Sequence, residues 1–171
     1  VALAIAGITK EKNKVFVDSG GATTDLTGPQ CSPNTVHWTY DTYMLARSAA
    51  LQLVKLGGNK WFFITANYVF GQQLERDAAR FVQDAGGSVL GHALFPFPTT
   101  TDFSSYLVEA QSSGANVVGL AMAGGDTANC VKQAHEFGVA SQMKLAALLA
   151  QPADVEAMGV EIAQGLYMTA T

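Results

Sequence analysis

The sequence predicts an α/β fold: a three-layer parallel sheet with helices on both faces, of the Rossmann or flavodoxin-like kind. From residue 61 onward, short apolar runs alternate with longer segments whose apolar residues have helical spacing. The run at 116–122 is apolar throughout, which is typical of a strand in the middle of a parallel sheet. Because parallel strands are joined by crossover helices, this alternation predicts βαβ units with helices covering both faces.

The first part of the chain has fewer elements and longer connections. Pro29 and Pro33 exclude a helix between residues 28 and 34. Asp41 or Thr42 is expected to cap the helix that follows, and Gly57 to end it. We expect, in order, a helix end at 1–8, a strand at 15–18, a short extended segment at 36–39 and a helix from 41 or 42 to 56.

The remainder of the chain repeats strand and helix. Thr101 or Asp102 is expected to cap one helix, and residues 124–127 (Gly-Gly-Asp-Thr) are expected to form the turn and N-cap of the next. Residues 1–37 hold few elements, whereas 38–171 have enough to form a core of their own. The expected strands are 61–65, 88–95, 116–122, 144–149 and 165–169, and the expected helices are 74–85, 103–113, 128–137 and 153–158.

Composition excludes several classes of protein. The chain has 171 residues, 49% of them hydrophobic and 14% charged, with a net charge of −4 and no Lys/Arg cluster, so a nucleic-acid partner is not expected. No apolar run is long enough to span a bilayer. Cys31 and Cys130 lack metal-ligand spacing, and a disulfide between them stays open. The chain starts inside an apolar run without Met or a signal peptide, which indicates a piece of a longer protein.

Catalytic and cofactor motifs are missing from the sequence. It has no Gly-x-Gly-x-x-Gly, no P-loop and no Gly-x-Ser-x-Gly. His37, His92 and His135 fall in unrelated predicted elements, so neither a metal site nor a bound cofactor is expected. Asp18 and Asp126 are each explained by a turn or a cap. We therefore expect a protein that is not an enzyme.

The segments that follow the predicted strands are small, aromatic and neutral. The carboxyl ends of parallel strands share one edge, where ligands bind in open α/β sheets. Backbone, hydroxyl and aromatic groups at this edge suit a pocket for a small ligand. The residues that follow successive strands are Ala22, Thr23 and Thr24, then Asn67, Tyr68 and Phe70, then Met122, Ala123 and Gly124, and finally Ala150 and Gln151.

Several motifs, in this order and spacing over nearly all of the chain, resemble the type I periplasmic binding proteins of branched-chain amino acid ABC transporters, the Leu/Ile/Val-binding family. The family fold has two α/β lobes joined by a hinge. The resemblance implies that residues 1–37 are a remnant of lobe one with the link to a hinge near 38–41, and that 38–171 are lobe two without its return crossing. The motifs are Ala-Thr-Thr-Asp-Leu-Thr at 22–27, Tyr-Val-Phe-Gly at 68–71, Asp-Phe-Ser at 102–104 and Gln-Gly-Leu at 164–166.

The resemblance also implies roles for individual residues. Ala22 with Thr23 or Thr24 would hold a ligand carboxylate through backbone N–H and hydroxyl groups. Phe70 occupies the position of an aromatic residue of the family's pocket. Ala123 falls where amino-acid binders often have a tyrosine. The remaining residues expected to bind ligand are Tyr40, Tyr68, Met122, Gly124 and Gln151.

The position that pairs with a ligand's ammonium departs from the family pattern. Leu149 or Ala150 stands where the family has an acidic residue. A buried ammonium without a carboxylate is destabilised by several kcal/mol, so an aromatic or short organic acid, or a neutral amide, is expected in place of an α-amino acid. The resemblance implies a monomeric periplasmic protein that presents its solute to an ABC permease in the membrane. The alternative is a ligand-sensing domain of a receptor or amide-responsive regulator with the same fold.

Overall fold

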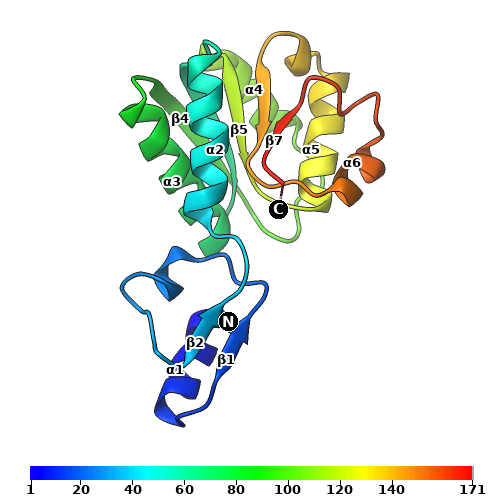
Figure 1. The fold of residues 1–171 in the computed structure, drawn as a ribbon. Coiled ribbons are helices and arrows are strands. Elements are labelled where there is room, and N and C mark those ends of the chain that lie inside the picture. Colours follow the sequence, from blue (N-terminus) through cyan, green and yellow to red (C-terminus); the bar gives the residue numbers. More distant parts are fainter. Residues whose placement is uncertain (171) are drawn as a thin grey trace. The chain divides into compact units, whose positions relative to one another are not determined.

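A five-stranded parallel sheet organises the larger part of the chain (Figure 1). The computed structural model describes residues 1–170, and the chain divides into an N-terminal unit, Val1–Met44, and a C-terminal unit, Leu45–Thr171. The sheet belongs to the C-terminal unit, and every neighbouring pair of strands is parallel, which confirms the predicted fold class. Its strands, in spatial order, are β4 (Ser88–Phe95), β3 (Lys60–Ala66), β5 (Val117–Ala121), β6 (Lys144–Ala147) and β7 (Tyr167–Met168).

Helices cover both faces of this sheet (Figure 1). On one face lie α2 (Thr42–Lys55) and α3 (Val69–Asp84). On the other lie α4 (Ser104–Ser112), α5 (Gly125–Glu136) and α6 (Pro152–Met158), with the short 3-10 turn η2 (Val139–Ser141) after α5. Within residues 1–170, no helix combines the length and the apolar character needed to cross a membrane.

Strand β3 supplies side chains to the core on both of its faces. Phe62 and Ile64 pack in the cluster that contains α4, α5 and α6. Trp61 and Phe63 alternate with them, are fully buried, and therefore face α2 and α3. Gly119 of β5 makes room for Phe63, because a Cβ there would lie 2.5 Å from the Phe63 ring. Large side chains on β3 are thus accommodated by small residues on the neighbouring strand β5.

Two helices begin earlier than the sequence predicts. α3 begins at Val69, not at 74, and α5 begins at Gly125, not at 128. Local spacing favours the later starts because Gly71 and Gly125 lower helix propensity. At Gly71 the close approach of the helix to the strands requires glycine: a Cβ would meet the carbonyl oxygens of Ala66 and Ala121.

The predicted caps have mixed outcomes. Asp41 caps α2, with Oδ1 accepting the Met44 N–H at 2.7 Å. Asp102 accepts the Ser104 N–H at 2.9 Å before α4, and this bond lowers the pKa of the Asp102 carboxyl. The N-cap of α5 falls within the predicted stretch 124–127, at Gly124 with φ 61°, and the Asp126 side chain does not cap the helix.

The N-terminal unit holds a small parallel sheet with one helix. β1 (Phe16–Asp18) pairs with β2 (Thr35–His37), and α1 (Ala2–Glu11) packs against both strands. The 3-10 turn η1 (Thr24–Leu26) lies in the connection between the strands. Val17 and Val36 are paired in register and exposed, and the adjoining Val15 and Trp38 are exposed as well. This unit therefore has an apolar sheet face in contact with solvent.

The two cysteines are both free thiols and differ in reactivity. Cys31 is exposed, whereas Cys130 is fully buried in α5, where burial and then the charge of Asp126 raise the pKa of its thiol. We expect a thiol reagent such as DTNB to modify one cysteine in the native protein, because only an accessible thiolate reacts. Intact-mass analysis should place the label on Cys31, and denaturant should release a second equivalent. Two equivalents under native conditions would contradict this assignment.

Candidate ligand-binding site

The loop after β1 is held at Gly21 by two side chains. Asp18 Oδ1 accepts the N–H groups of Gly20 at 3.3 Å and Gly21 at 2.9 Å. His37 Nε2 lies 2.6 Å from the Gly21 carbonyl oxygen, which only accepts, so the Nε2 atom carries the proton. Asp18 and His37 are opposite each other in the parallel register, which explains why both reach the same loop.

The three residues after Gly21 have backbone N–H groups without an acceptor in the described part of the chain. The N–H groups of Ala22, Thr23 and Thr24 donate to no acceptor within residues 1–170. Their chain is nevertheless fixed: the Ala22 carbonyl accepts the Thr42 N–H at 2.9 Å, and Thr23 Oγ1 accepts the Asp25 N–H at 3.3 Å. Unpaired backbone N–H groups are available as hydrogen-bond donors to an anion. This segment is therefore suited to bind a carboxylate.

The C-terminal unit brings most of its predicted residues to one edge of its sheet. Strand order β4-β3-β5-β6-β7 reverses direction between β3 and β5, which is the switch point where ligands bind in doubly wound sheets. Tyr68 and Phe70 follow β3, and Ala123 and Gly124 follow β5, so these four flank the switch point. Gln151 follows β6, the next strand along.

An aromatic cluster lies at this edge. The Tyr68 ring stacks on Phe97 with centroids 4.4 Å apart, and its centroid lies 5.9 Å from that of Phe70. Phe97 follows β4 and is 46% exposed, and the sequence analysis missed it. The alternation Phe95-Pro96-Phe97 offered a signal, because Phe95 is buried and the second ring lies past the end of the strand. Together the three rings supply a partly exposed apolar surface.

Two predicted residues have structural roles. Met122 is fully buried and packs in the core with α4, α5 and α6, so a ligand at this edge can meet only its backbone. Gln151 begins α6 in a capping box with Asp154, whose Oδ2 accepts the Gln151 N–H at 2.8 Å.

In the N-terminal unit, Tyr40 is partly exposed in the segment between β2 and α2.

Asp126 is an acidic group at this edge that the sequence analysis explained only as a cap. It lies in the first turn of α5, two residues after Gly124, and is partly exposed. Within residues 1–170 it has no hydrogen bond and no ion pair. Partial burial raises the pKa of its carboxyl. Asp126 is thus a carboxyl group available to a ligand or to solvent.

The three histidines lie in separate environments. His37 holds the loop of the N-terminal unit, His92 Nδ1 lies 2.5 Å from Glu75 Oε1, and His135 is in the last turn of α5. In the part of the chain that the structure describes, no group of three or more His, Cys, Asp or Glu side chains is placed to hold a metal ion.

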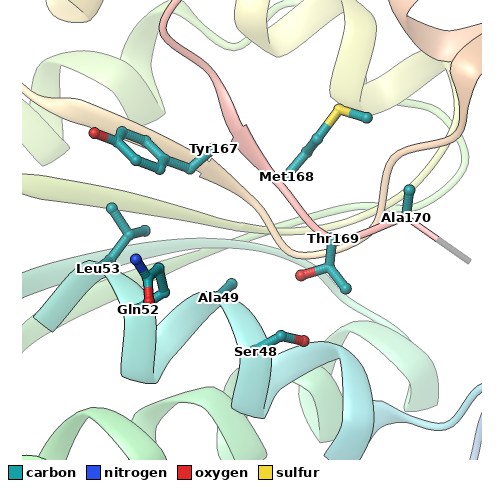
Figure 2. A pocket seen from close by; sticks show the side chains of 8 residues that line it. All are labelled: Ser48, Ala49, Gln52, Leu53, Tyr167, Met168, Thr169 and Ala170. Carbon is teal, nitrogen blue, oxygen red and sulfur yellow. The ribbon is translucent and has the colours of Figure 1, made fainter. Parts of the chain in front are cut away.

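A separate hollow of about 320 Å³ lies between α2 and β7 (Figure 2). Its lining contains no charged side chain and none of the predicted ligand-binding residues. Thr169 Oγ1 donates to the Leu45 carbonyl at 3.2 Å. The hollow therefore offers a ligand neutral hydroxyl and amide groups but no cation. Its lining residues are Ser48, Ala49, Gln52, Leu53, Tyr167, Met168, Thr169 and Ala170.

A doubly wound parallel sheet with an aromatic cluster at its switch-point edge is the architecture in which small ligands commonly bind at that edge. The model of the periplasmic binding protein family matches residues 1–171, and the chain belongs to this family. A periplasmic binding protein from Burkholderia mallei is 49% identical, with a TM-score of 0.91 over 96% of this chain. An amino acid ABC transporter substrate-binding protein from Pseudomonas fluorescens is 28% identical, with a TM-score of 0.90 over 99% of this chain.

A third solved structure contains a ligand. It is a solute-binding protein of an ABC transporter from R. palustris in complex with 4-hydroxybenzoate, 25% identical, with a TM-score of 0.80 over 95% of this chain. The chain spans less than half of each of these relatives, 44%, 46% and 44% of their lengths in the order given. A search of curated proteins found no match.

Proposed function

We propose that this chain is part of the solute-binding component of an ABC uptake transporter, and that it binds a small organic acid in a cleft between two lobes. In this proposal the protein works in the periplasm and presents its solute to a membrane permease. Family membership and the ABC transporter relatives support the general role. The unpaired N–H groups of Ala22–Thr24 carry the assignment of a carboxylate ligand.

In this proposal, backbone N–H groups bind the ligand carboxylate, a role that a Lys or Arg side chain has in other carboxylate sites. Peptide N–H groups that the surrounding chain already holds in place stabilise an anion with little further ordering penalty at the moment of binding. The Thr24 hydroxyl, which has no partner within residues 1–170, adds a further donor next to them. The aromatic cluster of Tyr68, Phe70 and Phe97 would contact the remainder of the ligand.

The residues after β6 argue against an α-amino acid. Leu149 and Ala150 are both buried and apolar, so this position offers no counter-charge to an ammonium. An aromatic acid needs none, and the relative from R. palustris was solved with 4-hydroxybenzoate. We therefore favour an aromatic or short organic acid as the ligand.

Isothermal calorimetry on the full-length protein with 4-hydroxybenzoate, benzoate and leucine tests the proposal. We expect binding of at least one aromatic acid and none of leucine. Tight binding of leucine would overturn the ligand class. In that case Asp126→Asn identifies the ammonium partner, because loss of the Asp126 carboxylate would abolish leucine binding.

The aromatic cluster gives a sharper test of the same proposal. Phe70→Ala is expected to weaken binding of an aromatic acid by about ten- to a hundredfold, since removing a buried aromatic contact costs about 1.5–3 kcal/mol. The matched control is Val69→Ala, because Val69 is adjacent in the chain but 61% exposed. Calorimetry should show an unchanged affinity in the control, and equal losses in both variants would exclude Phe70 from the site.

A further inference from the structure

The Asp18–His37 pair has a role that packing alone does not explain. Their side chains are 8% and 7% exposed, respectively, and both contact the same glycine. Asp18 Oδ2 is buried without a hydrogen-bond partner, and His37 Nε2 lies 4.0 Å from it. Burying a carboxyl and an imidazole group under this loop carries a desolvation penalty. An apolar pair of the same volume would fill the space without that penalty.

We propose that Asp18 and His37 are positioning residues that aim the Ala22 N–H, the first unpaired donor of the Ala22–Thr24 loop, at a ligand carboxylate. This inference rests on the proposed function and adds residues that would not touch the ligand. We call the Asp18 and His37 side chains, together with Gly21, the loop anchor.

The direction of the Ala22 N–H follows from the geometry of the peptide bond. In a trans peptide the carbonyl of one residue and the N–H of the next are antiparallel within one plane. His37 holds the Gly21 carbonyl oxygen at 2.6 Å, so the Ala22 N–H of the same peptide points away from the imidazole. Asp18 Oδ1 holds the Gly21 N–H on the other side of the residue. Both peptide planes around Gly21 are thereby fixed.

Glycine is required for this arrangement. A Cβ at position 21 would lie 2.5 Å from Asp18 Oδ2 and 2.7 Å from the Ala2 Cβ. A glycine has wide conformational freedom in the absence of other contacts, so the direction of the Ala22 N–H depends on the two side-chain bonds to Gly21. Loss of the His37 bond is expected to let the Gly21–Ala22 peptide rotate, and loss of the Asp18 bond to let the Gly20–Gly21 peptide rotate. Either change is expected to misalign the Ala22 N–H without unfolding the unit.

Paired variants of the full-length protein test the loop anchor. His37→Leu and Asp18→Ala remove the bonds to Gly21, whereas His37→Gln keeps an N–H donor and Asp18→Asn keeps the Oδ1 acceptor. We expect the first two to weaken 4-hydroxybenzoate binding at least tenfold in calorimetry and the second two to stay within about threefold. The double variant His37→Leu/Asp18→Ala should be no weaker than the worse single variant, because both bonds act on one glycine.

A matched control separates positioning from stability. Ala6→Gly in α1 removes a buried methyl group from the same unit without touching the loop anchor. It is expected to lower the melting temperature as much as His37→Leu does and to leave the affinity within twofold. Equal loss of affinity in Ala6→Gly and His37→Leu would overturn the proposal, as would full affinity in His37→Leu.

A ligand-independent measurement separates this proposal from the proposed function. Backbone ¹⁵N order parameters of residues 21–24 should fall in His37→Leu and be restored in His37→Gln. If the wild type binds none of the acids tested, the proposed function fails, and unchanged order parameters in His37→Leu would overturn the loop anchor separately.

Discussion

Replacing Trp61 by alanine is expected to lower the free energy of unfolding of the C-terminal unit by about 3–5 kcal/mol. Trp61 is fully buried in β3, its Nε1 donates to the Gly58 carbonyl at 2.7 Å, and its ring centroid lies 5.6 Å from that of Phe63. The substitution leaves a large cavity beside β3 and an unpaired Gly58 carbonyl. Urea denaturation monitored by circular dichroism measures this change in the free energy of unfolding.

The chain provides its own control for this substitution. Trp38 is 77% exposed, so Trp38→Ala is expected to change the free energy of unfolding by less than about 0.5 kcal/mol. If the two variants were equally destabilised, the assignment of Trp61 to the core on the α2–α3 face would be wrong.

Gly71→Ala is expected to destabilise the C-terminal unit by about 1–3 kcal/mol and to weaken ligand binding as well. The new Cβ would meet the carbonyl oxygens of Ala66 and Ala121, and neither can move without displacing a strand. The start of α3 must shift instead, and Tyr68 and Phe70 shift with it. Thermal unfolding and calorimetry with 4-hydroxybenzoate measure the two effects.

Gly125→Ala is the matched control for Gly71→Ala. Gly125 is the first residue of α5 at the same edge of the sheet, and a Cβ there would meet nothing within 4 Å. We expect unchanged affinity and a melting temperature equal to or slightly above that of the wild type, since alanine has the higher helix propensity. A loss of stability in Gly125→Ala similar to that in Gly71→Ala would mean that close approach is not the cause.

Much of the fold was predictable because its elements have strong local signals. The strand expected at 88–95 is observed as β4, Ser88–Phe95, and each βα unit from residue 61 onward is present. The starts of α3 and α5 were not predictable from spacing, since glycines occupy their first turns for reasons of packing. Burial of Met122 likewise depends on which face of β5 each residue takes after the strand ends.

The candidate site was predictable as a set of strand ends but not as contacts. Neutral loops after parallel strands indicated the edge that holds Tyr68, Phe70 and Ala123. The stacking of Phe97 on Tyr68 joins loops of two strands, and the Asp18–His37 pairing depends on the register of β1 with β2. Register and loop packing arise from tertiary structure, which no single stretch of sequence specifies.

The exposed apolar face of the β1–β2 sheet has a consequence for handling this polypeptide. Val15, Val17 and Val36 present branched side chains to water, and Trp38 adds a ring beside them. Parallel sheets normally have both faces covered, and a bare, valine-rich face favours association with any other apolar surface. We therefore expect this small patch to promote self-association of the 171-residue polypeptide at high concentration, although most of the buried core lies in the other unit. A lysine at Val36 would improve solubility without touching the core, the aromatic cluster or the loop anchor.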